Sequence, residues 1–499
     1  MSTRLQVPLL GVMAGTAMGE VNIASTALVD ASRGLGMAAD IVPIAASAMS
    51  MFCGATVISS GLAADRLGRR RVLVFGLLLG VCSELLTALS FSSWVYIAGR
   101  SLTGVSIGIV FAAAFAYVRS VSSKGQLGNA LGVFGAVAGF TMIVETFVGG
   151  SLASVLWRAA FVVVPSAYVI SALLVPKILP VQPRVGSGPI DAVGQVLLAI
   201  GLVGPLYAIS RMTTSLTSPI TLISLVIGLV ALVCFYLWER RTPHPFFPVR
   251  ILSSPMFLAG VLFGIGFNLS NSTLVLQLAN VWQYALRMDT VQVALAEVPA
   301  LAIGVVASIY AGRLLSGGWH ERRLGIIGFA AVSIGYASLA LYHHNAGFWM
   351  FIPALLLVGA GAQILNVPFG SLVIKSAPAD AIGPVTASRS TIGSFANAFG
   401  MAASTVLINR LTTGGIVERM EQAKVPPGNY GSVLDVVTAY IRTDELPSVE
   451  AARQVISGAT ESYLHAFAVT MGVIAVAMLA MGVLATWLLR TRLGEPTVP

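Results

Sequence analysis

The sequence contains little charge and few cysteines. Only 10% of its 499 residues are charged, against about 25% in an ordinary soluble domain, and 56% are hydrophobic. This composition excludes a soluble enzyme and a disordered chain, because too little polar surface is available to cover so much apolar material. The three cysteines, Cys53, Cys82 and Cys234, each lie in an apolar run, so no disulfide framework is expected. The composition is that of a polytopic membrane protein.

The sequence also lacks the residue patterns that many enzymes need. It shows no nucleotide-binding loop, metal-ligand cluster or nucleophile–base arrangement, and His343 and His344 have no partner at metal-binding spacing. The net charge of +9 does not indicate nucleic-acid binding, because the basic residues occur in short clusters between apolar segments. We therefore expect no enzyme activity and no bound metal, cofactor or nucleic acid.

Long apolar runs, by contrast, are abundant. A helix needs about 20 mostly apolar residues to span a bilayer, and fourteen runs meet this requirement. They cover approximately residues 7–29, 42–63, 71–90, 93–118, 128–153, 157–176, 191–210, 219–238, 256–279, 291–311, 324–342, 348–373, 390–409 and 464–489. The expected fold is an all-α membrane protein with fourteen transmembrane helices, and the short connections predict antiparallel neighbours.

The basic residues predict the orientation of these spans. If the N-terminus is cytoplasmic, the inner loops hold most of the lysines and arginines, as cytoplasmic loops usually do. The short outer loops then hold only Arg33, Arg158, Arg211 and Arg287. We therefore expect a multi-pass protein of the cell inner (plasma) membrane with both termini cytoplasmic. The one large extramembrane segment is the outer loop 410–463, which is expected to be a solvated cap.

The loop between the second and third predicted spans carries a recognisable motif. It reads Gly61-Leu-Ala-Ala-Asp65-Arg66-Leu-Gly68-Arg69-Arg70-Arg71, a tight turn with an acid beside a cluster of cations. A membrane-surface anchor would explain the arginines but not the spacing of the glycines and the aspartate. The motif resembles the corresponding loop of the major facilitator superfamily. By this resemblance the conformational motif consists of Gly61, Asp65, Arg66, Gly68, Arg69 and Arg70.

Further matches extend over nearly the whole chain. They are Arg100 with Gly104, Trp157-Arg158, Asp191 with Gly194, and Trp238-Glu239. Together they resemble the fourteen-spanner drug:proton antiporter family of the EmrB/QacA type. The resemblance implies two six-helix bundles, at residues 1–180 and 251–499, with a hinge and two linking helices at 181–250. It also implies a transporter, expected to be a monomer, whose partners are a small amphipathic substrate, protons and membrane lipids.

The fifth predicted span departs from the antiporter motif of that family. Its marker positions read Gly132, Thr141, Glu145, Thr146, Gly149 and Gly150, so Glu145-Thr146 replaces a glycine and a proline. The proline kink is lost and an acid is gained. In the first span, Glu20 stands at the position of the family's acid.

Five ionisable residues inside the predicted spans are functional candidates, because burying a charge near the bilayer centre costs at least about 2.5 kcal/mol. They are Glu20, Glu84, Arg100, Glu145 and Glu297. At a rise of about 1.5 Å per residue they lie roughly 9 to 14 Å from the outer ends of their spans. We expect Arg100 to pair with Glu20 or Glu145. Glu84 could instead extend outward from a peripheral helix, and Glu297 could form a structural pair with Arg287.

Three of these acids would face a single cation. If Glu20, Glu84 and Glu145 were all ionised beside Arg100, the local net charge would be about −2, which desolvation and like-charge repulsion both oppose. At least one acid should therefore hold a proton near neutral pH, as proton coupling requires. Glu20, Glu145, Arg100 and Glu84 are the predicted proton-coupling residues.

The second half of the chain offers mainly uncharged polar residues within its spans. Hydrogen bonding between packed helices would account for about half of them. The residues predicted to line a substrate cavity are Asn22, Asn268, Asn271, Gln277, Glu297, Gln363, Asn366 and Asn397.

These features favour a proton-coupled exporter of amphipathic drugs or toxic compounds that works by alternating access. The altered fifth-span motif leaves open an exporter of an endogenous lipid or a siderophore-like metabolite. A non-transporting membrane sensor is a third hypothesis. Uptake also stays open, because topology alone does not determine the direction of transport.

Overall fold

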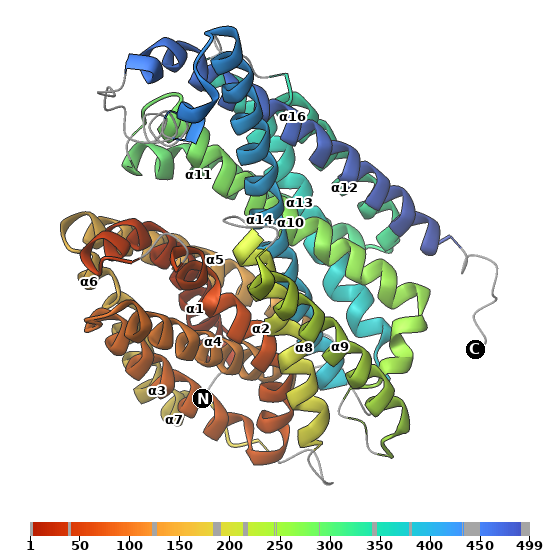
Figure 1. Cartoon of the computed structure of the whole chain (residues 1–499). Helices are drawn as coiled ribbons and strands as arrows, with labels where there is room; N and C mark the ends of the chain where they lie inside the picture. The colour runs from red at the N-terminus through yellow and green to blue at the C-terminus, as the bar shows by residue number, and fades with distance from the viewer. Residues whose placement is uncertain are drawn as a thin grey trace. The chain divides into compact units, whose positions relative to one another are not determined.

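The computed structural model describes residues 3–37, 41–121, 127–182, 191–212, 218–243, 245, 247–288, 290–341, 347–378, 382–431, 433 and 450–490. These residues form helices and short connections without any strand (Figure 1). The first half of the chain forms α1 (Thr3–Gly34), α2 (Val42–Leu67), α3 (Arg69–Ala88), α4 (Ser93–Val121), α5 (Leu127–Val155), α6 (Trp157–Ala160), α7 (Val163–Ile178), α8 (Ala192–Met212) and α9 (Pro219–Arg241). The second half forms η1 (Val249–Ser253), α10 (Pro255–Tyr284), α11 (Thr290–Ser316), α12 (Glu321–Leu339), η2 (Phe348–Phe351), α13 (Ile352–Ser376), α14 (Ile382–Gln422), η3 (Pro427–Asn429) and α16 (Glu450–Leu488).

Each of the fourteen predicted runs coincides with helical structure. Within the described residues, twelve helices are long and apolar enough to cross a membrane. The two remaining runs correspond to α2, where side chains outside the described ones, at residues 43 and 58, limit the apolar segment to Ile44–Val57, and to α12, which begins with the charged residues Glu321, Arg322 and Arg323. The all-helical architecture is therefore confirmed. The number of candidate membrane spans that the described residues support directly is twelve.

The helices that flank the predicted outer loop 410–463 extend into it. Helix α14 does not end near residue 409 but continues to Gln422, and α16 begins at Glu450 rather than near residue 464. The two extensions are joined by an ion pair of Arg419 with Glu461 at 2.8 Å. A drop in hydropathy was interpreted as the end of a helix, but polar residues can continue a helix beyond the hydrocarbon wherever water or a neighbouring helix satisfies their side chains. Residues 434–449 of the predicted loop lie outside the described part of the chain.

The chain divides into two compact units. Unit 1 comprises Met1–Val261, Gly312–Gly317 and Gly370–Ala398, and unit 2 comprises Leu262–Ala311, Gly318–Phe369 and Phe399–Pro499. In unit 1, α1 packs against α5 and α4, and α4 packs against α2 and α3. The three-part division into residues 1–180, 181–250 and 251–499 stays a prediction, and most of the segment expected to act as the hinge, residues 183–190, lies outside the described part.

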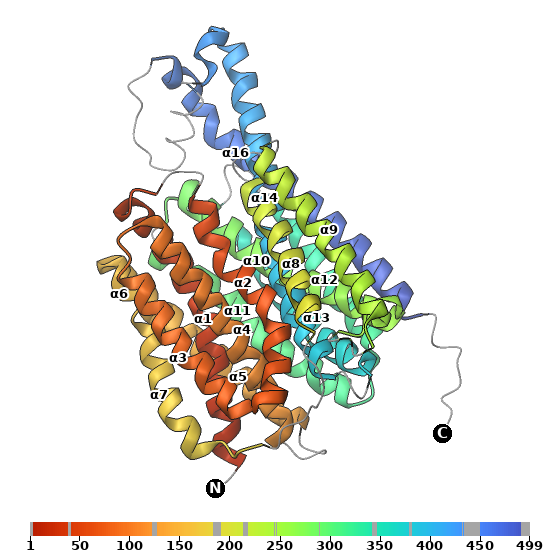
Figure 2. The same cartoon turned by 60° about the horizontal axis from the view of Figure 1, so that its bottom comes forward.

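The predicted linking helices α8 and α9 pack against each other and belong to unit 1 (Figure 2). Helix α8 also lies against α2, where the hydroxyl of Ser47 donates to the hydroxyl oxygen of Ser210 at 2.8 Å. One step further along the same face, Leu206 packs with Met51 and Ala398 in a buried apolar cluster. These contacts attach the α8–α9 hairpin to the N-terminal helices.

In unit 2, helices approach one another closely at glycines. Helix α12 lies beside α16, and a Cβ at Gly482 of α16 would meet the Phe329 side chain of α12 at 2.6 Å. The ring of Phe329 also packs edge-on against Phe263 of α10. Small residues at such crossings allow dense packing in the absence of a hydrophobic driving force between membrane helices.

Candidate functional site

Arg100 of α4 is the centre of a buried ion network in unit 1. Its Nη1 donates to Oε1 of Glu20 on α1 and, at 3.3 Å, to Oε1 of Glu84 on α3. Its Nη2 lies 2.8 Å from Sδ of Met49 on α2. Glu20 and Glu84 have no exposed surface, and Arg100 is 1% exposed. Three helices therefore bring side chains to one guanidinium of α4 that is sealed from solvent.

Close helix packing positions this network. A Cβ at Gly104, one turn beyond Arg100, would clash with the backbone carbonyl of Met49, so only glycine lets α4 approach α2 this closely. Between α3 and α4, the hydroxyl of Thr103 lies 2.7 Å from Oε1 of Glu84 and 3.0 Å from the hydroxyl of Ser83. Glu84 thus accepts from Arg100 and Thr103, which lie three residues apart on the same face of α4.

Aromatic residues cover the guanidinium on one side. The Cζ atom of Arg100 lies 5.5 Å from the centre of the Phe161 ring. Tyr96 and Trp157 each pack edge-on against Phe161, with ring centres 6.0 and 6.2 Å away. All three rings are buried. This cover excludes water and adds a cation–π contact to the ion pairs of Arg100.

A polar seam joins α1 to α5 beside the network. The hydroxyl of Thr16 donates to Oε1 of Glu145 at 2.7 Å, and Nδ2 of Asn22 donates to the hydroxyl of Thr146 at 3.1 Å. The seam is close because α1 carries small residues there: a Cβ at Gly19 would lie 3.2 Å from Cβ of Glu145. Glu145 and Thr146, which replace a glycine and a proline of the antiporter motif, therefore both bond to α1.

The structure decides between the alternatives considered for these charges. The pairing of Arg100 with Glu20 is confirmed, and Glu145 bonds to Thr16 instead of Arg100. The alternative that Glu84 extends outward is wrong, because its carboxyl group is fully buried at Arg100. The direction in which the Glu84 side chain points depends on how α3 is rotated against α4. The sequence of α3 alone does not specify this rotation.

The network holds more negative than positive groups. Glu20 and Glu84 present two carboxyl groups to one guanidinium. Among the described residues, the Oε2 atoms of Glu20, Glu84 and Glu145 are buried without a hydrogen-bond partner. Buried carboxylates that lack partners are costly, so this arrangement can accept at least one proton.

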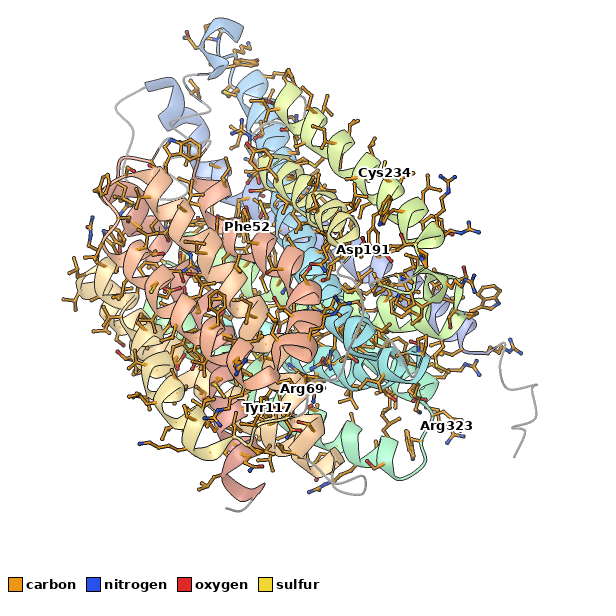
Figure 3. All side chains as sticks on the ribbon, turned by 90° about the horizontal axis from the view of Figure 1, so that it is seen from below. Phe52, Arg69, Tyr117, Asp191, Cys234 and Arg323 are labelled. Carbon is orange, nitrogen blue, oxygen red and sulfur yellow. The ribbon has the colours of Figure 1, made fainter. Side chains whose placement is uncertain are left out.

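The predicted conformational motif lies at the junction of α2 and α3. Gly68, with φ of +103°, is the only residue between the two helices, and this left-handed backbone favours glycine. Nη1 of Arg69 donates to the backbone carbonyl of Ala116 at 3.2 Å, next to Tyr117, so the motif reaches the end of α4 (Figure 3). Gly61 is buried on α2, and Arg66 and Arg70 are half-buried. The side chain of Asp65 lies outside the described residues.

Most of the predicted cavity residues contact neighbouring residues of their own unit. Nε2 of Gln277 donates to the hydroxyls of Ser404 and Thr405, which is packing between α10 and α14. Asn366 donates to Gln363 on the same helix, and Asn268 donates to the Gly264 carbonyl of its own helix. Asn271 is exposed and Asn397 is half-buried. A shared substrate cavity made by these residues stays a prediction.

Glu297 on α11 is half-buried, and the described part of the chain offers it no hydrogen bond or ion pair. The alternative of a structural pair with Arg287 is therefore wrong. Arg287 lies beyond the end of α10, with a backbone φ of 55°. The described residues also include no group of three or more His, Cys, Asp or Glu side chains that could hold a metal ion.

The sequence analysis missed the neutral partners of the buried acids. Thr16, Met49 and Thr103 contact the charged groups directly, and the hydroxyl of Tyr168 is buried near them. A signal was available for two of these residues. Thr16 lies four residues before Glu20 and Thr103 lies three after Arg100, and both spacings place side chains on one face of a helix.

Comparison with known proteins places this arrangement in a family. Residues 9–401 match the Major Facilitator Superfamily. The chain is 31% identical over 424 residues to the puromycin resistance protein pur8 of Streptomyces alboniger, covering 82% of this chain and 80% of that protein. It is 24% identical over 377 residues to the quinolone resistance protein NorB of Staphylococcus aureus (strain MRSA252), covering 73% of this chain and 79% of that protein.

Solved structures show the same fold. A bacterial homologue of the human lysosomal transporter Spinster superimposes with a TM-score of 0.66 at 12% identity, covering 100% of both chains. A D-xylose–proton symporter superimposes with a TM-score of 0.60 at 14% identity, covering 96% of this chain and 97% of that chain. The helical architecture, the motif at Gly68 and the matched length agree, and this chain belongs to the Major Facilitator Superfamily.

Proposed function

We propose that this multi-pass membrane transporter is a secondary active exporter that releases amphipathic drugs outward as protons enter. The sequence similarity to the puromycin and quinolone resistance proteins supports the substrate class. Alternating access is the expected mode of transport, with substrate entering from the cytoplasm or the inner leaflet. Both termini are proposed to be cytoplasmic.

The observation that carries the coupling proposal is the buried group of Glu20, Glu84 and Arg100. Two carboxyl groups share one guanidinium without any exposed surface, so their full ionisation would leave a negative charge inside the protein. Binding of a proton removes this charge, and its release restores it. A conformational change that gives Glu20 access to water on one side and then the other would couple this cycle to transport. Glu145 lies beside the group and is included in the proposed coupling set.

We also propose that α2 and α12 span the membrane, which gives fourteen spans. Helix α2 packs along α4 over much of its length, and α4 is long and apolar enough to cross. Helix α12 lies along α16, which also meets that requirement. Both helices accompany spanning partners, and α12, which begins with three charged residues, buries Leu324, Phe329 and Val332 among its apolar side chains.

Replacing Glu20 by glutamine tests the coupling. Glutamine keeps the size of the side chain but cannot release a proton, so we expect proton-gradient-driven export of puromycin to fall at least about tenfold, the change produced by about 1.4 kcal/mol. Gradient-independent exchange of puromycin across the membrane should persist. The measurement is efflux from inverted vesicles or proteoliposomes with and without an imposed pH gradient.

The matched control is Glu461→Gln, the same change at an exposed acid on the α16 extension. This variant should keep gradient-driven export. If the Glu20→Gln variant responded to the gradient as the unmodified protein does, the coupling role of Glu20 would be refuted.

The replacement of Gly-Pro by Glu145-Thr146 in the fifth span favours a second candidate function. An exporter of an endogenous lipid or a siderophore-like metabolite would bind that amphiphile and change drug susceptibility little. Deletion of the gene separates the two proposals: a fall in the minimum inhibitory concentration of puromycin supports drug export. Unchanged susceptibility together with retention of a cellular amphiphile supports the second candidate.

A further inference from the structure

Glu145 is held differently from the other buried acids. Its Oε1 accepts from Thr16 at 2.7 Å, whereas Glu20 and Glu84 both accept from Nη1 of Arg100. Its Oε2 is buried without a hydrogen-bond partner in the part of the chain described. The ion pairs of Arg100 go to Glu20 and Glu84, and none of the described contacts joins it to Glu145. Glu145 therefore lies beside the network without sharing its cation.

The titratable groups that face Glu145 do not neutralise it. From α1 it faces Glu20, and from α7 it faces the phenol of Tyr168. Arg100 of α4 pairs with Glu20 and Glu84, and Arg158 of α6 donates to the Ser90 carbonyl oxygen. An ionised Glu145 would repel an ionised Glu20 and would have a single hydrogen bond to offset its burial. A proton on Glu145 relieves both effects.

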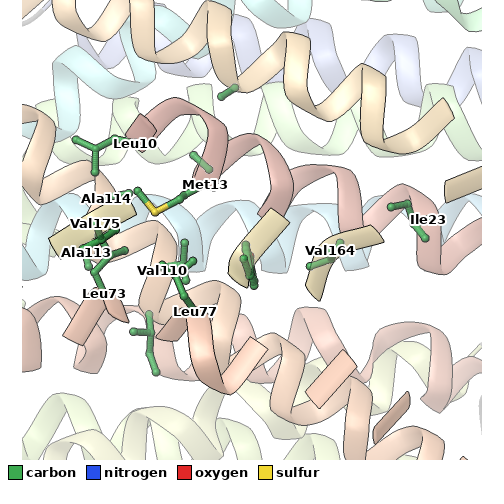
Figure 4. Packing of buried hydrophobic residues seen from close by; sticks show 14 of the residues in the cluster. Leu10, Met13, Ile23, Leu73, Leu77, Val110, Ala113, Ala114, Val164 and Val175 are labelled. Carbon is green, nitrogen blue, oxygen red and sulfur yellow. The ribbon is translucent and has the colours of Figure 1, made fainter. Parts of the chain in front are cut away.

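The exposed fraction of the side chain also distinguishes Glu145. It is 7% exposed, whereas Glu20 and Glu84 are 0% exposed. Toward the Arg69 end of the bundle, the interior is filled by fully buried apolar side chains that include Leu10, Met13 and Leu77 (Figure 4). In the other direction, the rings of Tyr96, Trp157 and Phe161 cover Arg100. Both routes along the bundle axis to Arg100 are closed by apolar groups.

We propose that Glu145 is a second proton-binding site, distinct from the Glu20–Arg100–Glu84 network, and that Thr16 is its positioning residue. A proton from water binds the carboxylate of Glu145 first. When it passes to ionised Glu20, Glu145 becomes the carboxylate and Glu20 the neutral acid, so the total charge of the site is unchanged. The role in transport rests on the proposed function, but the proton binding itself does not.

The binding site can be tested without any transported substrate. In an infrared pH titration of the purified full-length protein in lipid nanodiscs, the carboxyl C=O band reports buried protonated acids. We expect Glu145→Gln to remove one titrating component and Glu20→Gln to retain it. If the titration of Glu145→Gln matched that of the unmodified protein, Glu145 would not be a proton site. If Glu145→Gln fails to fold, Glu145→Asp replaces it as the test. Its shorter side chain draws the carboxyl away from Thr16 and should shift the titration midpoint of the same component.

The positioning role of Thr16 has its own readout. Its hydroxyl donates to the ionised form of Glu145, so Thr16→Val should favour protonation and move that component about one pH unit toward alkaline pH. Thr16→Ser keeps the hydroxyl and should restore the original midpoint. An unchanged midpoint in Thr16→Val, with the protein folded, would overturn the positioning role, because a purely structural residue would not affect the titration.

The outcomes for the two proposals are separable. If Glu20→Gln abolishes gradient-driven export while Glu145→Gln leaves the infrared titration intact, the second site is refuted and the proposed function stands. If the Glu145 component is present but export does not respond to a gradient in the unmodified protein, the proposed function fails and the second proton site stands.

Discussion

Replacement of Arg100 by alanine should destabilise unit 1 by about 3 to 5 kcal/mol, the usual cost of removing one partner from a buried ion pair. The guanidinium is the one cation that contacts Glu20 and Glu84 among the described residues, and both acids are fully buried. Without it, two carboxyl groups would have to be protonated or would face each other as charges. The free energy of unfolding in mixed micelles measures this loss, and gradient-driven export should be lost with it.

Three comparisons make the Arg100 prediction specific. Arg100→Lys keeps the positive charge but lacks the planar guanidinium, so the loss in free energy of unfolding should be smaller than for Arg100→Ala. Arg100→Gln combined with Glu20→Gln and Glu84→Gln removes all three charges and should recover much of the stability. Arg33, whose exposed side chain lies 3.9 Å from Asp30, is the control, and Arg33→Ala should cost less than about 0.5 kcal/mol. Equal stability of Arg100→Ala and the unmodified protein would show that the network does not stabilise unit 1.

Replacement of Gly15 by valine should be the most disruptive change at the contact between α1 and α5. A Cβ at this position would lie 2.6 Å from Cβ of Thr141 and closer still to the backbone carbonyl of Ala138. A backbone atom cannot move aside as a side chain can, so α1 must separate from α5. We expect a loss of about 3 kcal/mol, the upper range for overpacking. Thr16 directly follows Gly15 on α1. The separation should therefore also break the hydrogen bond from Thr16 to Glu145.

Gly139 of α5 offers a matched control for this change. No atom would lie within 4 Å of a Cβ at Gly139, although it is in the same helix as Thr141. Gly139→Val should therefore stay within about 0.5 kcal/mol of the unmodified protein in the same unfolding assay. If the two valine variants had equal stability, close packing of α1 on α5 would not be the reason for glycine at position 15.

The pairing of Glu20 with Arg100 could be predicted because the position of a residue along its helix follows from the sequence. Glu20 and Arg100 were placed in one layer by counting residues from the ends of their spans, and the structure joins them. Their partners were harder to predict. Whether Glu145 faced Arg100 or Thr16 depends on the rotation of α5 about its axis, and Gly15 and Gly19 of α1 decide that rotation through contacts distant in sequence.

The ends of helices were also difficult to predict from the sequence. The predicted end near residue 409 followed the loss of apolar residues, but α14 continues to Gln422 because Ile416 and Met420 are buried on its extension. Hydropathy reports where a segment leaves the hydrocarbon, which is a different property from where the helix stops.

The sequence by itself determined that this chain is a helical membrane protein and where most of its spans lie. These properties depend on composition and on the constant rise of a helix, both of which are local. Only the tertiary structure decided that Glu84 shares Arg100 with Glu20, and that Glu145 bonds to α1 outside that network. Partners of this kind depend on how helices from distant parts of the sequence rotate and approach one another, which packing between small side chains controls.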